Sequence, residues 1–291
     1  MMWPHAVPLV DYVLVGHLTL DLLPDGSSRP GGTVAYAALT ARRLGLRVGV
    51  VTAYRGPADY AALEAEGVWV TGVETPTLTT FRLEETDAGR VLRLTARGPQ
   101  LHPYHVPQAW RTAAIAHLAP VAQEVEPAVV QVFTRGMVAL TPQGWLREWD
   151  AEGRVRPGPW PEAAYVLPRS AAAVVSEEDL GRDPNRIAEL ARQCRVLVVT
   201  RGAAGADLYW QGRVYHQDAP QVPLVDPTGA GDIFAAVFFA RLYWTRDPVD
   251  ALARATWLAS QSVTRPGLAG VPTAEEIEAA LGVPRPIPPG L

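Results

Sequence analysis

The chain is organised around the stretch Val225-Asp226-Pro227-Thr228-Gly229-Ala230-Gly231-Asp232-Ile233-Phe234, in the last quarter of its 291 residues. Apolar residues alternate before this stretch, as at the end of a β-strand, and residues 233–240 after it are apolar on every side. This change of period predicts a strand, a loop and then a buried helix. The loop holds two glycines and an alanine in a row, so a ligand can approach its backbone closely.

The same loop predicts an anion site. The N–H groups of Gly229, Ala230 and Gly231 would be the first unpaired donors of the helix, at the positive end of its dipole. Asp232 would then lie in the first helical turn, with its carboxylate beside the anion. A simple helix cap needs only one such residue, and Asp226 or Thr228 would already serve. Two glycines and a second carboxylate exceed that need, so the stretch indicates function.

The motif DPTGAGD followed by an apolar helix resembles the C-terminal signature of the ribokinase-like, phosphofructokinase-B-type carbohydrate kinases. In that family the last Asp is the base that deprotonates the acceptor hydroxyl, and this role matches Asp232. The resemblance assigns Gly229, Ala230 and Gly231 to the transferring phosphoryl group and Thr228 to the cofactor site. It also implies a three-layer α/β/α sandwich with a mostly parallel central sheet.

Composition excludes several classes of function. The chain has 26 basic and 30 acidic residues and no basic run, which disfavours nucleic acid as a partner. All 26 basic residues are Arg, so a Walker-type P-loop, a protein-kinase strand lysine and a pyridoxal-phosphate Schiff base cannot be built. Cys194 is the single cysteine, and neither a signal peptide nor an apolar run of roughly 18 residues is visible, which predicts a cytoplasmic protein away from membranes.

The N-terminal half alternates between strands and helices. Strands are predicted at 12–16, 47–52 and 67–71, with helices from about 33 to 44 and from 57 to 66, which indicates a parallel sheet with covering helices. The rhythm breaks at residue 75, where 79–83 and 91–94 read as a hairpin. The resemblance implies a small β-lid from about 18–29 and 75–97, which in many family members also makes the dimer contact. A homodimer through the lid is therefore one expectation.

The substrate side is assigned by the resemblance. Asp21 matches the Asp that binds substrate hydroxyls, and Gly31-Gly32-Thr33 match the N-terminal signature of the family. Tyr36 stands where that signature usually has Asn, which is more reminiscent of the inositol kinase branch.

The remaining strands are predicted at 113–118, 137–141, 171–175 and 195–200, with a helical link at about 124–133. Gln143 follows the second of these strands, where sheets of this class bind ligands, so Gln143 and Arg147 are candidate pocket residues. The turn Thr200-Arg201-Gly202 to Gly205 matches the one that lines the ATP site of relatives, with Arg201 a candidate phosphate partner. The helix at 248–264 would wall the adenine, with Thr256 as a contact.

Ser176-Glu177-Glu178-Asp179 has two interpretations. It reads as a capping box, with Ser176 as the N-cap and Asp179 at the third helical position. It also reads as a variant of the family's Asn-x-x-Glu element, in which Asp179 would organise magnesium-bound water. The two interpretations are compatible, and both stay open.

These observations predict a single kinase domain over residues 1–291 that phosphorylates a hydroxyl of a small sugar or cyclitol. ATP and Mg²⁺ are the implied cofactors, and the resemblance leaves a monovalent cation open as a third. Two alternatives remain: a nucleoside or pyrimidine kinase of the same fold, in which Tyr36 could stack a base, and a non-catalytic paralogue that senses sugars.

Overall fold

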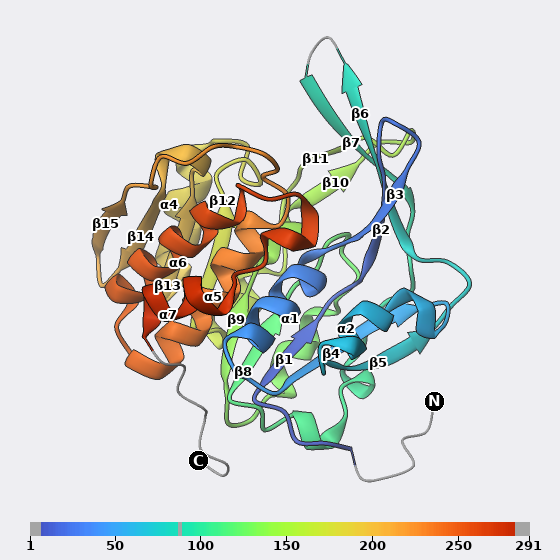
Figure 1. The fold of residues 1–291 in the computed structure, drawn as a ribbon, viewed down its shortest axis with the longest axis horizontal. Coiled ribbons are helices and arrows are strands. Elements are labelled where there is room, and N and C mark those ends of the chain that lie inside the picture. Colours follow the sequence, from blue (N-terminus) through green and yellow to red (C-terminus); the bar gives the residue numbers. More distant parts are fainter. Residues whose placement is uncertain (1–6, 87–88, 283–291) are drawn as a thin grey trace.

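A nine-stranded sheet forms the centre of the computed structural model, which describes residues 7–86 and 89–282 (Figure 1). Its strands are β1 (Tyr12–Val15), β4 (Val48–Tyr54), β5 (Trp69–Glu74), β8 (Ile115–Leu118), β9 (Met137–Leu140), β12 (Ala172–Ser176), β13 (Val196–Thr200), β14 (Ala206–Trp210) and β15 (Arg213–Gln217). Their spatial order is β15-β14-β13-β12-β9-β8-β1-β4-β5. The strands from β13 to β5 run parallel, while β14 and β15 pair antiparallel at one edge.

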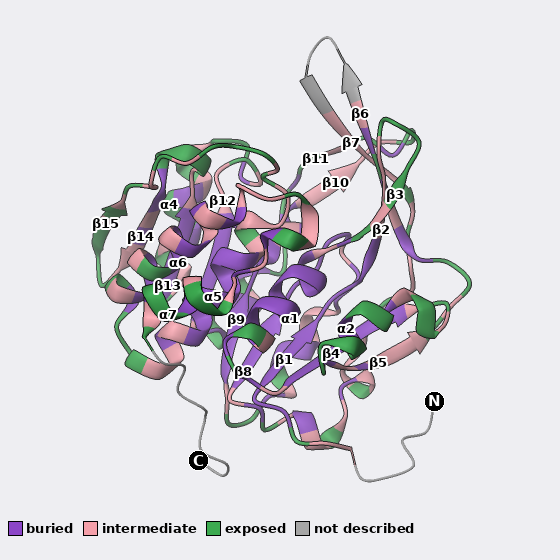
Figure 2. Cartoon of the chain, in the orientation of Figure 1, coloured by how far each residue is buried: buried purple, intermediate pink, exposed green. Residues whose placement is uncertain are grey.

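Helices cover both faces of this sheet. On one face lie α1 (Thr33–Arg43), α2 (Ala61–Ala65), α5 (Ala230–Thr245), α6 (Pro248–Ser262) and α7 (Ala274–Leu281). The other face is covered by α3 (Ala163–Val166), α4 (Pro184–Gln193) and 3₁₀ segments. Alternate strand residues point into the two cores, so that Tyr12 and Leu14 join the first and Val13 and Val15 the second. Figure 2 shows the central strands and α5 as mostly buried. The predicted three-layer sandwich is confirmed.

A four-stranded sheet stands at one end of the molecule, in the order β3-β2-β6-β7 (Figure 1). Its strands are β2 (Thr19–Leu22), β3 (Ser28–Gly31), β6 (Thr79–Thr86) and β7 (Gly89–Ala96). They come from the two segments predicted for the lid, although residues 87–88 of the hairpin tip lie outside the described residues. The lid rests on the small hairpin of β10 (Arg147–Trp149) and β11 (Val155–Pro157), where Leu94 N–H donates to Gly153 O at 2.8 Å.

The strand predicted just before Asp226 is absent: residues 218–224 have no regular structure, and Leu224 is 69% exposed. Two further local predictions are wrong. The helical link expected around 124–133 is only a 3₁₀ segment, Pro127–Gln131. The reason is that the Glu124 carboxylate is buried and accepts hydrogen bonds from the N–H groups of His17, Val121 and Ala122, which holds the preceding loop instead of a helix.

The second of these predictions is the capping box at residues 176–179. Its two characteristic hydrogen bonds have counterparts, since Ser176 Oγ accepts from Glu178 N–H and an Asp179 oxygen accepts from Ser176 N–H. No helix follows them, however. The segment is a turn, and α4 begins only at Pro184, capped by Asp183.

A buried histidine predicts how stability should depend on pH. His117 bonds Tyr12 Oη at 3.0 Å and Thr141 Oγ1 at 2.9 Å, and burial lowers its pKa from 6.5 to about 3. Below pH 6.5 the unfolded chain therefore binds a proton at His117 that the folded chain does not bind. As the pH is lowered from 6.5 toward 3, the free energy of unfolding should decrease by about 1.4 kcal/mol per pH unit. Urea unfolding across this pH range should show that the free energy of unfolding depends less steeply on pH in His117→Gln than in the wild type. An equally steep dependence would contradict the assignment of this effect to His117.

Across the described residues, none of the helices has the length and apolar character that crossing a membrane requires.

Candidate active site

The candidate site lies at the carboxyl ends of the parallel strands. The chain runs outward from β1 toward β5 on one side and from β8 toward β13 on the other, so the sheet changes direction between β1 and β8. Ligands of open α/β sheets bind beside such a point, outside the carboxyl ends. Two of the predicted site residues, Gln143 and Asp179, follow the ends of β9 and β12, and Thr200 is the last residue of β13. Asp21 lies on β2, the lid strand that follows β1. The structure thus gathers residues that are far apart in sequence at one edge.

The anion loop, residues 226–231, leads into α5 as predicted. Gly229 precedes the helix in the left-handed conformation (φ 80°), and no side chain caps the first turn. The expected cap by Asp226 or Thr228 is therefore wrong, because the Asp226 carboxylate instead accepts from Thr228 N–H at 2.9 Å. The helix N–H groups keep no side-chain partner from the cap position, which is the arrangement an anion site requires.

The two glycines of the loop serve different purposes. A Cβ on Gly229 would lie 2.2 Å from Tyr36 Cδ1, so the aromatic ring packs directly against the loop backbone. A Cβ on Gly231 would meet nothing within 4 Å. Gly229 is thus required by the protein's own packing, whereas the bare backbone at Gly231 faces open space. Tyr36 itself is buried, and its ring has this packing partner rather than an open face for a substrate.

Asp232 lies in the first turn of α5 and is half-buried. Burial raises its pKa to about 6, and the charges of Asp179 and Asp21 push in the same direction. A hydrogen bond with Thr33 and the positive charge of Arg147 act against this rise in pKa. A carboxylate with a pKa near 6 is ionised at neutral pH yet basic enough to accept a proton, which suits a general base.

Arg147 lies among the three carboxylates. Its Nη1 donates to Val121 O at 3.1 Å, and its guanidinium lies 5.5 Å from the centre of the Phe81 ring in the lid. Burial lowers its pKa, while Asp179 and Asp232 help to keep it charged. Burial likewise raises the pKa of Asp179, against which Arg147 and a hydrogen bond from Gln143 act. Gln143 and Arg147 are therefore connected to the candidate site by their interactions with Asp179.

The lid contributes Asp21 and the adjacent glycines. Thr19 Oγ1 donates to Asp21 Oδ1 at 2.9 Å, and a Cβ on Gly31 would lie 2.4 Å from Asp21 Oδ2. Gly32 has φ 88° and turns the chain from β3 into α1. Only glycine allows β3 to approach the Asp21 carboxylate this closely. The N-terminal signature thus positions Asp21.

The predicted ATP turn lies next to Asp179. Ser176 pairs with Thr200 across β12 and β13, and Glu177 N–H donates to Thr200 O at 3.0 Å. Arg201, a candidate for phosphate, is held by Glu177 at 2.6 Å and Asp207 at 2.7 Å.

The other predicted cofactor residues have different surroundings. Gly205 is buried, and a Cβ there would lie 2.0 Å from Gln217 O, so the turn itself requires it. Gly202, in contrast, meets nothing within 4 Å. Thr256 is buried on α6, and its hydroxyl has no hydrogen-bond partner among the described residues.

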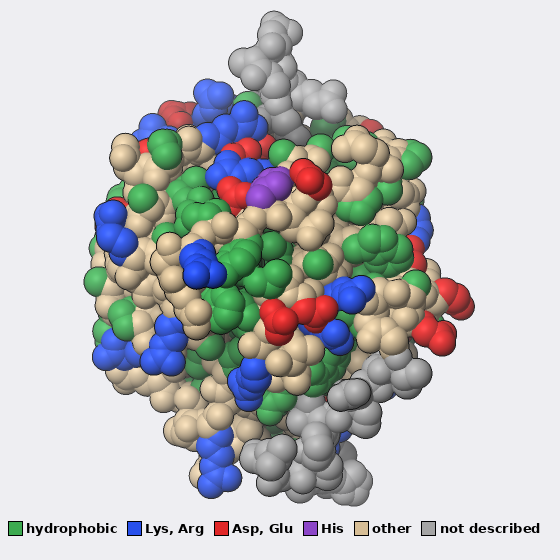
Figure 3. Space-filling model, turned by 90° about the vertical axis from the view of Figure 1, so that its left-hand side faces the viewer, with side chains coloured by type: hydrophobic (Ala, Val, Ile, Leu, Met, Phe, Trp, Pro, Cys, Tyr) green, Lys and Arg blue, Asp and Glu red, His purple; other side chains and the backbone are tan. Residues whose placement is uncertain are grey.

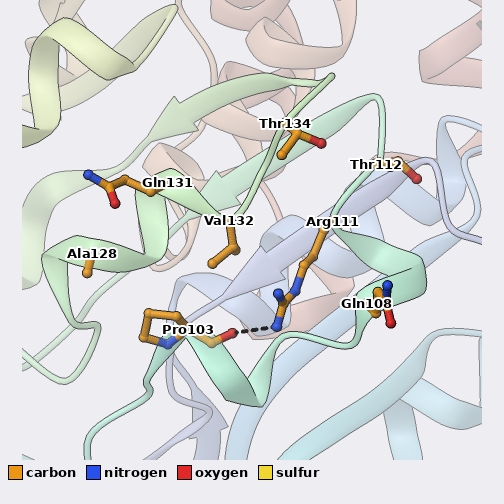
Figure 4. A pocket seen from close by; sticks show the side chains of 8 residues that line it. All are labelled: Pro103, Gln108, Arg111, Thr112, Ala128, Gln131, Val132 and Thr134. Atoms are coloured by element: carbon orange, nitrogen blue, oxygen red, sulfur yellow. Dashed lines mark hydrogen bonds between the residues drawn. The ribbon is translucent and has the colours of Figure 1, made fainter.

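Two cavities differ in their relation to these residues. One of about 370 Å³ is lined by lid residues Val91 and Leu92 and by Arg147 and Asp179, among others, so it adjoins the carboxylates. The other, of about 540 Å³, is lined by Pro103, Gln108, Arg111, Thr112, Ala128, Gln131, Val132 and Thr134 (Figure 4). Residues 111–112 and 134 precede β8 and β9, at the amino ends of the strands, so the larger cavity lies away from Asp232.

The residues present fit Mg²⁺ only as an ion held largely by phosphates and water. No group of three or more His, Cys, Asp and Glu side chains that could hold a metal occurs in the described part of the chain. Magnesium at phosphate sites keeps several waters and needs only one or two carboxylates. Asp179 is the carboxylate that could hold such a hydrated ion, since its charge acts on Asp232 directly after the anion loop.

One residue of the site was missed from sequence. Arg29 on β3 donates to Asp226 at 3.0 Å and to Thr228 at 2.8 Å, and so ties the lid to the anion loop. Its only signal was its place two residues before the Gly31-Gly32 pair, because nothing local points to contacts 197 and 199 residues away.

Comparisons with known proteins agree with this geometry. Residues 167–274 match the family model described as pfkB family carbohydrate kinase. An inositol 3-kinase of Zea mays is 32% identical over 191 residues, which cover 63% of this chain but only 48% of the relative. A fructokinase of Escherichia coli is 28% identical over 254 residues, 77% of this chain and 81% of that one. The chain thus spans about half the length of the maize protein.

Solved structures show the ribokinase-like fold. A pyrophosphate-dependent kinase of the ribokinase family, complexed with a pyrophosphate analogue and myo-inositol, superposes with a TM-score of 0.78 at 20% identity, covering 92% of this chain and 99% of that one. The Arabidopsis thaliana ribokinase complexed with ribose and ATP gives a TM-score of 0.73 at 18% identity, covering 94% and 99%.

Proposed function

We propose, from the premise that this chain carries a pfkB family carbohydrate kinase domain, that it transfers a phosphoryl group from ATP to a hydroxyl of a small sugar or cyclitol. The observation that carries the proposal is that Asp232, a carboxylate of raised pKa, directly follows the loop of Gly229, Ala230 and Gly231, whose amides no side chain caps. Of these amides, Ala230 N–H donates to Pro227 O at 3.2 Å. Phosphoryl transfer to an alcohol needs a proton acceptor on one side and charge stabilisation on the other.

In this mechanism Asp232 accepts the proton of the acceptor hydroxyl as that oxygen bonds to the γ-phosphorus of ATP. The bond from the γ-phosphorus to the bridging oxygen breaks, and ADP leaves with that oxygen. The loop amides stabilise charge on the oxygens of the transferring phosphoryl group, and Thr33 holds the Asp232 carboxylate in place through its hydrogen bond. Asp21, Gly31, Gly32 and Gln143 would orient the acceptor, and the lid over them would exclude water that could compete as acceptor.

Donor binding is assigned to the other side of the loop. Thr200, Arg201, Gly202, Gly205, Thr228 and Thr256 would line the nucleotide, and Mg²⁺ near Asp179 would neutralise the phosphates. Leu224 and Val225, just before the loop, are 69% and 59% exposed, which suits contact with a purine base. Hydrophobic side chains also gather on the face that contains the β14–β15 edge (Figure 3). The exposed Leu224 and Val225 favour ATP over pyrophosphate, which has no base to cover them.

A cyclitol acceptor is supported by the similarity to the inositol 3-kinase of Zea mays. The nucleoside kinase alternative depended on stacking of a base on Tyr36. The Tyr36 ring is buried against Gly229 and offers no face to a base, so the structure gives this alternative no support. A panel of sugars, inositols and nucleosides, assayed by ADP release, separates these acceptors. Nucleotide binding without turnover on any of them would favour the sugar-sensing alternative.

Three further features belong to the proposal. A homodimer through the lid is supported by the edge strand β3, whose residues Ser28 and Pro30 are exposed, and a mass measurement in solution tests it. A monovalent cation as an additional activator is tested by exchanging K⁺, Na⁺ and tetramethylammonium in the assay. A cytoplasmic location is supported by the single cysteine.

The pH profile should report the electrostatics around Asp232. Below the pKa of about 6 its carboxyl group is protonated, so kcat/KM should fall about tenfold per pH unit there. Arg147 lowers this pKa, and Arg147→Gln should therefore move the acid limb upward by roughly one pH unit. Asp179 raises it, so Asp179→Asn should move the limb in the opposite direction. Equal limbs in all three proteins would show that Asp232 is not the titrating group.

A further inference from the structure

Arg29 makes the longest-range polar connection of the site. Its Nη1 donates to Asp226 Oδ2 at 3.0 Å and its Nη2 to Thr228 Oγ1 at 2.8 Å. The guanidinium thus places one rigid, charged group across two neighbouring acceptors of the anion loop, an arrangement that lysine cannot reproduce. Both partners of the ion pair are largely shielded from water, with side chains that are 25% and 16% exposed.

The Asp226 carboxylate collects several other bonds of the loop. It accepts from Thr228 N–H and from Gly267 N–H, each at 2.9 Å. Partial burial acts to raise its pKa, but the bonds from Thr228, Gly267 and Arg29 outweigh burial and lower the pKa to about 2. Asp226 is therefore charged throughout the working range of pH. Removing Arg29 would leave a half-buried carboxylate without its ion pair, and the loop would lose its fixed position.

The backbone of Arg29 belongs to the lid. Arg29 lies opposite Asp21 in the β2–β3 ladder, so the residue predicted to hold the acceptor and the residue that holds the loop are paired neighbours. The charge of Arg29 also reaches Tyr36, whose ring supports Gly229 from below. One side chain therefore connects the acceptor side of the site to the phosphoryl side.

We infer that Arg29 is a positioning residue that fixes the anion loop and couples its geometry to the base of the lid. The kinetic consequence rests on the proposed function, whereas the effect on the loop does not.

The test is chemical rescue of Arg29→Ala. Its kcat should fall on the order of 10²-fold with a smaller change in acceptor KM, because the loop is misplaced rather than absent. Millimolar guanidinium should restore about a tenth or more of the lost kcat, because it occupies the space that the Arg29 side chain has left. NaCl or KCl of equal ionic strength should not restore kcat. Arg29→Lys should stay impaired, since an ammonium group makes only one of the two bonds in that geometry. Arg43→Ala, which removes an exposed ion pair with Glu66, is the matched control and should change neither kcat nor its response to guanidinium.

Hydrogen exchange gives a readout that does not need turnover. In Arg29→Ala the amides of residues 28, 29 and 31 and of residues 226 and 228–232 should exchange faster together. Guanidinium should slow them again, while Arg43→Ala leaves them unchanged. Full activity in Arg29→Lys, rescue by any salt, or unchanged exchange in both segments would each overturn the inference. An inactive wild-type protein with the expected exchange pattern would instead count against the proposed function alone.

Discussion

Replacing Asp232 by Asn should lower kcat by a factor on the order of 10² to 10⁴ while ATP affinity is nearly kept. The amide has the shape of the carboxylate but cannot accept the hydroxyl proton. The structure adds that the fold should not suffer, because burial raises the pKa of Asp232 to about 6 and the ionised form is therefore disfavoured in its surroundings. Loss of activity and loss of stability should thus separate in this variant.

The measurement is steady-state kinetics beside thermal unfolding and ATP titration. Asp59→Asn is a suitable control, since Asp59 pairs with Arg55 in the connection between β4 and α2 and lies outside the candidate site. It should retain full turnover. Turnover of Asp232→Asn within a few-fold of the wild type would remove Asp232 from the role of base.

The second large effect should separate the two glycines of the anion loop. Gly231→Ala adds a methyl group to open space, and alanine is the better helix residue, so the melting temperature should be kept or rise slightly. The same methyl group would stand where the phosphoryl group must approach the backbone. We expect kcat/KM to fall on the order of 10²-fold, as for a displacement of about 1 Å in a reacting group.

Gly229→Ala should show the opposite pattern. Its backbone has φ 80°, and the new Cβ would lie 2.2 Å from the Tyr36 ring. The expected cost is about 2 to 4 kcal/mol of stability, from backbone strain and overpacking together. Thermal unfolding and kinetics of both variants check the contrast. A stable Gly231→Ala protein with full activity would contradict the assignment of these amides to the phosphoryl group.

The sequence was most informative where local pattern and chemistry coincide. The glycine loop and the buried helix around Asp232 were predictable because an all-apolar helix and a run of bare backbone are visible in a single window. The strand expected before them does not form, because apolar alternation in so short a segment does not supply a partner strand. The lid was predictable because its hairpin interrupts an α/β rhythm. Both features depend on residues that are near one another in the chain.

What could not be predicted depends on distant partners. Glu124 looked like the start of a helix, yet its carboxylate binds the N–H of His17, more than a hundred residues earlier. Tyr36 looked like a pocket wall, yet its ring supports Gly229. For Arg29 the sequence offered only its place before the Gly31-Gly32 pair, because its two acceptors come from the last quarter of the chain. Such contacts exist only after the sheet has brought the strand ends together.

The most direct test of the central claim is a turnover measurement with product identification. Purified protein with ATP and Mg²⁺ is given each of a set of sugars and cyclitols, and ADP release is followed alongside phosphorus NMR of the products. A sugar or cyclitol kinase that uses Asp232 as its base should release ADP only with one acceptor class and form a new phosphate monoester on that acceptor. Both should be lost in Asp232→Asn. ADP release that ignores the acceptor, or a phosphorylated product formed equally well by Asp232→Asn, would contradict this function.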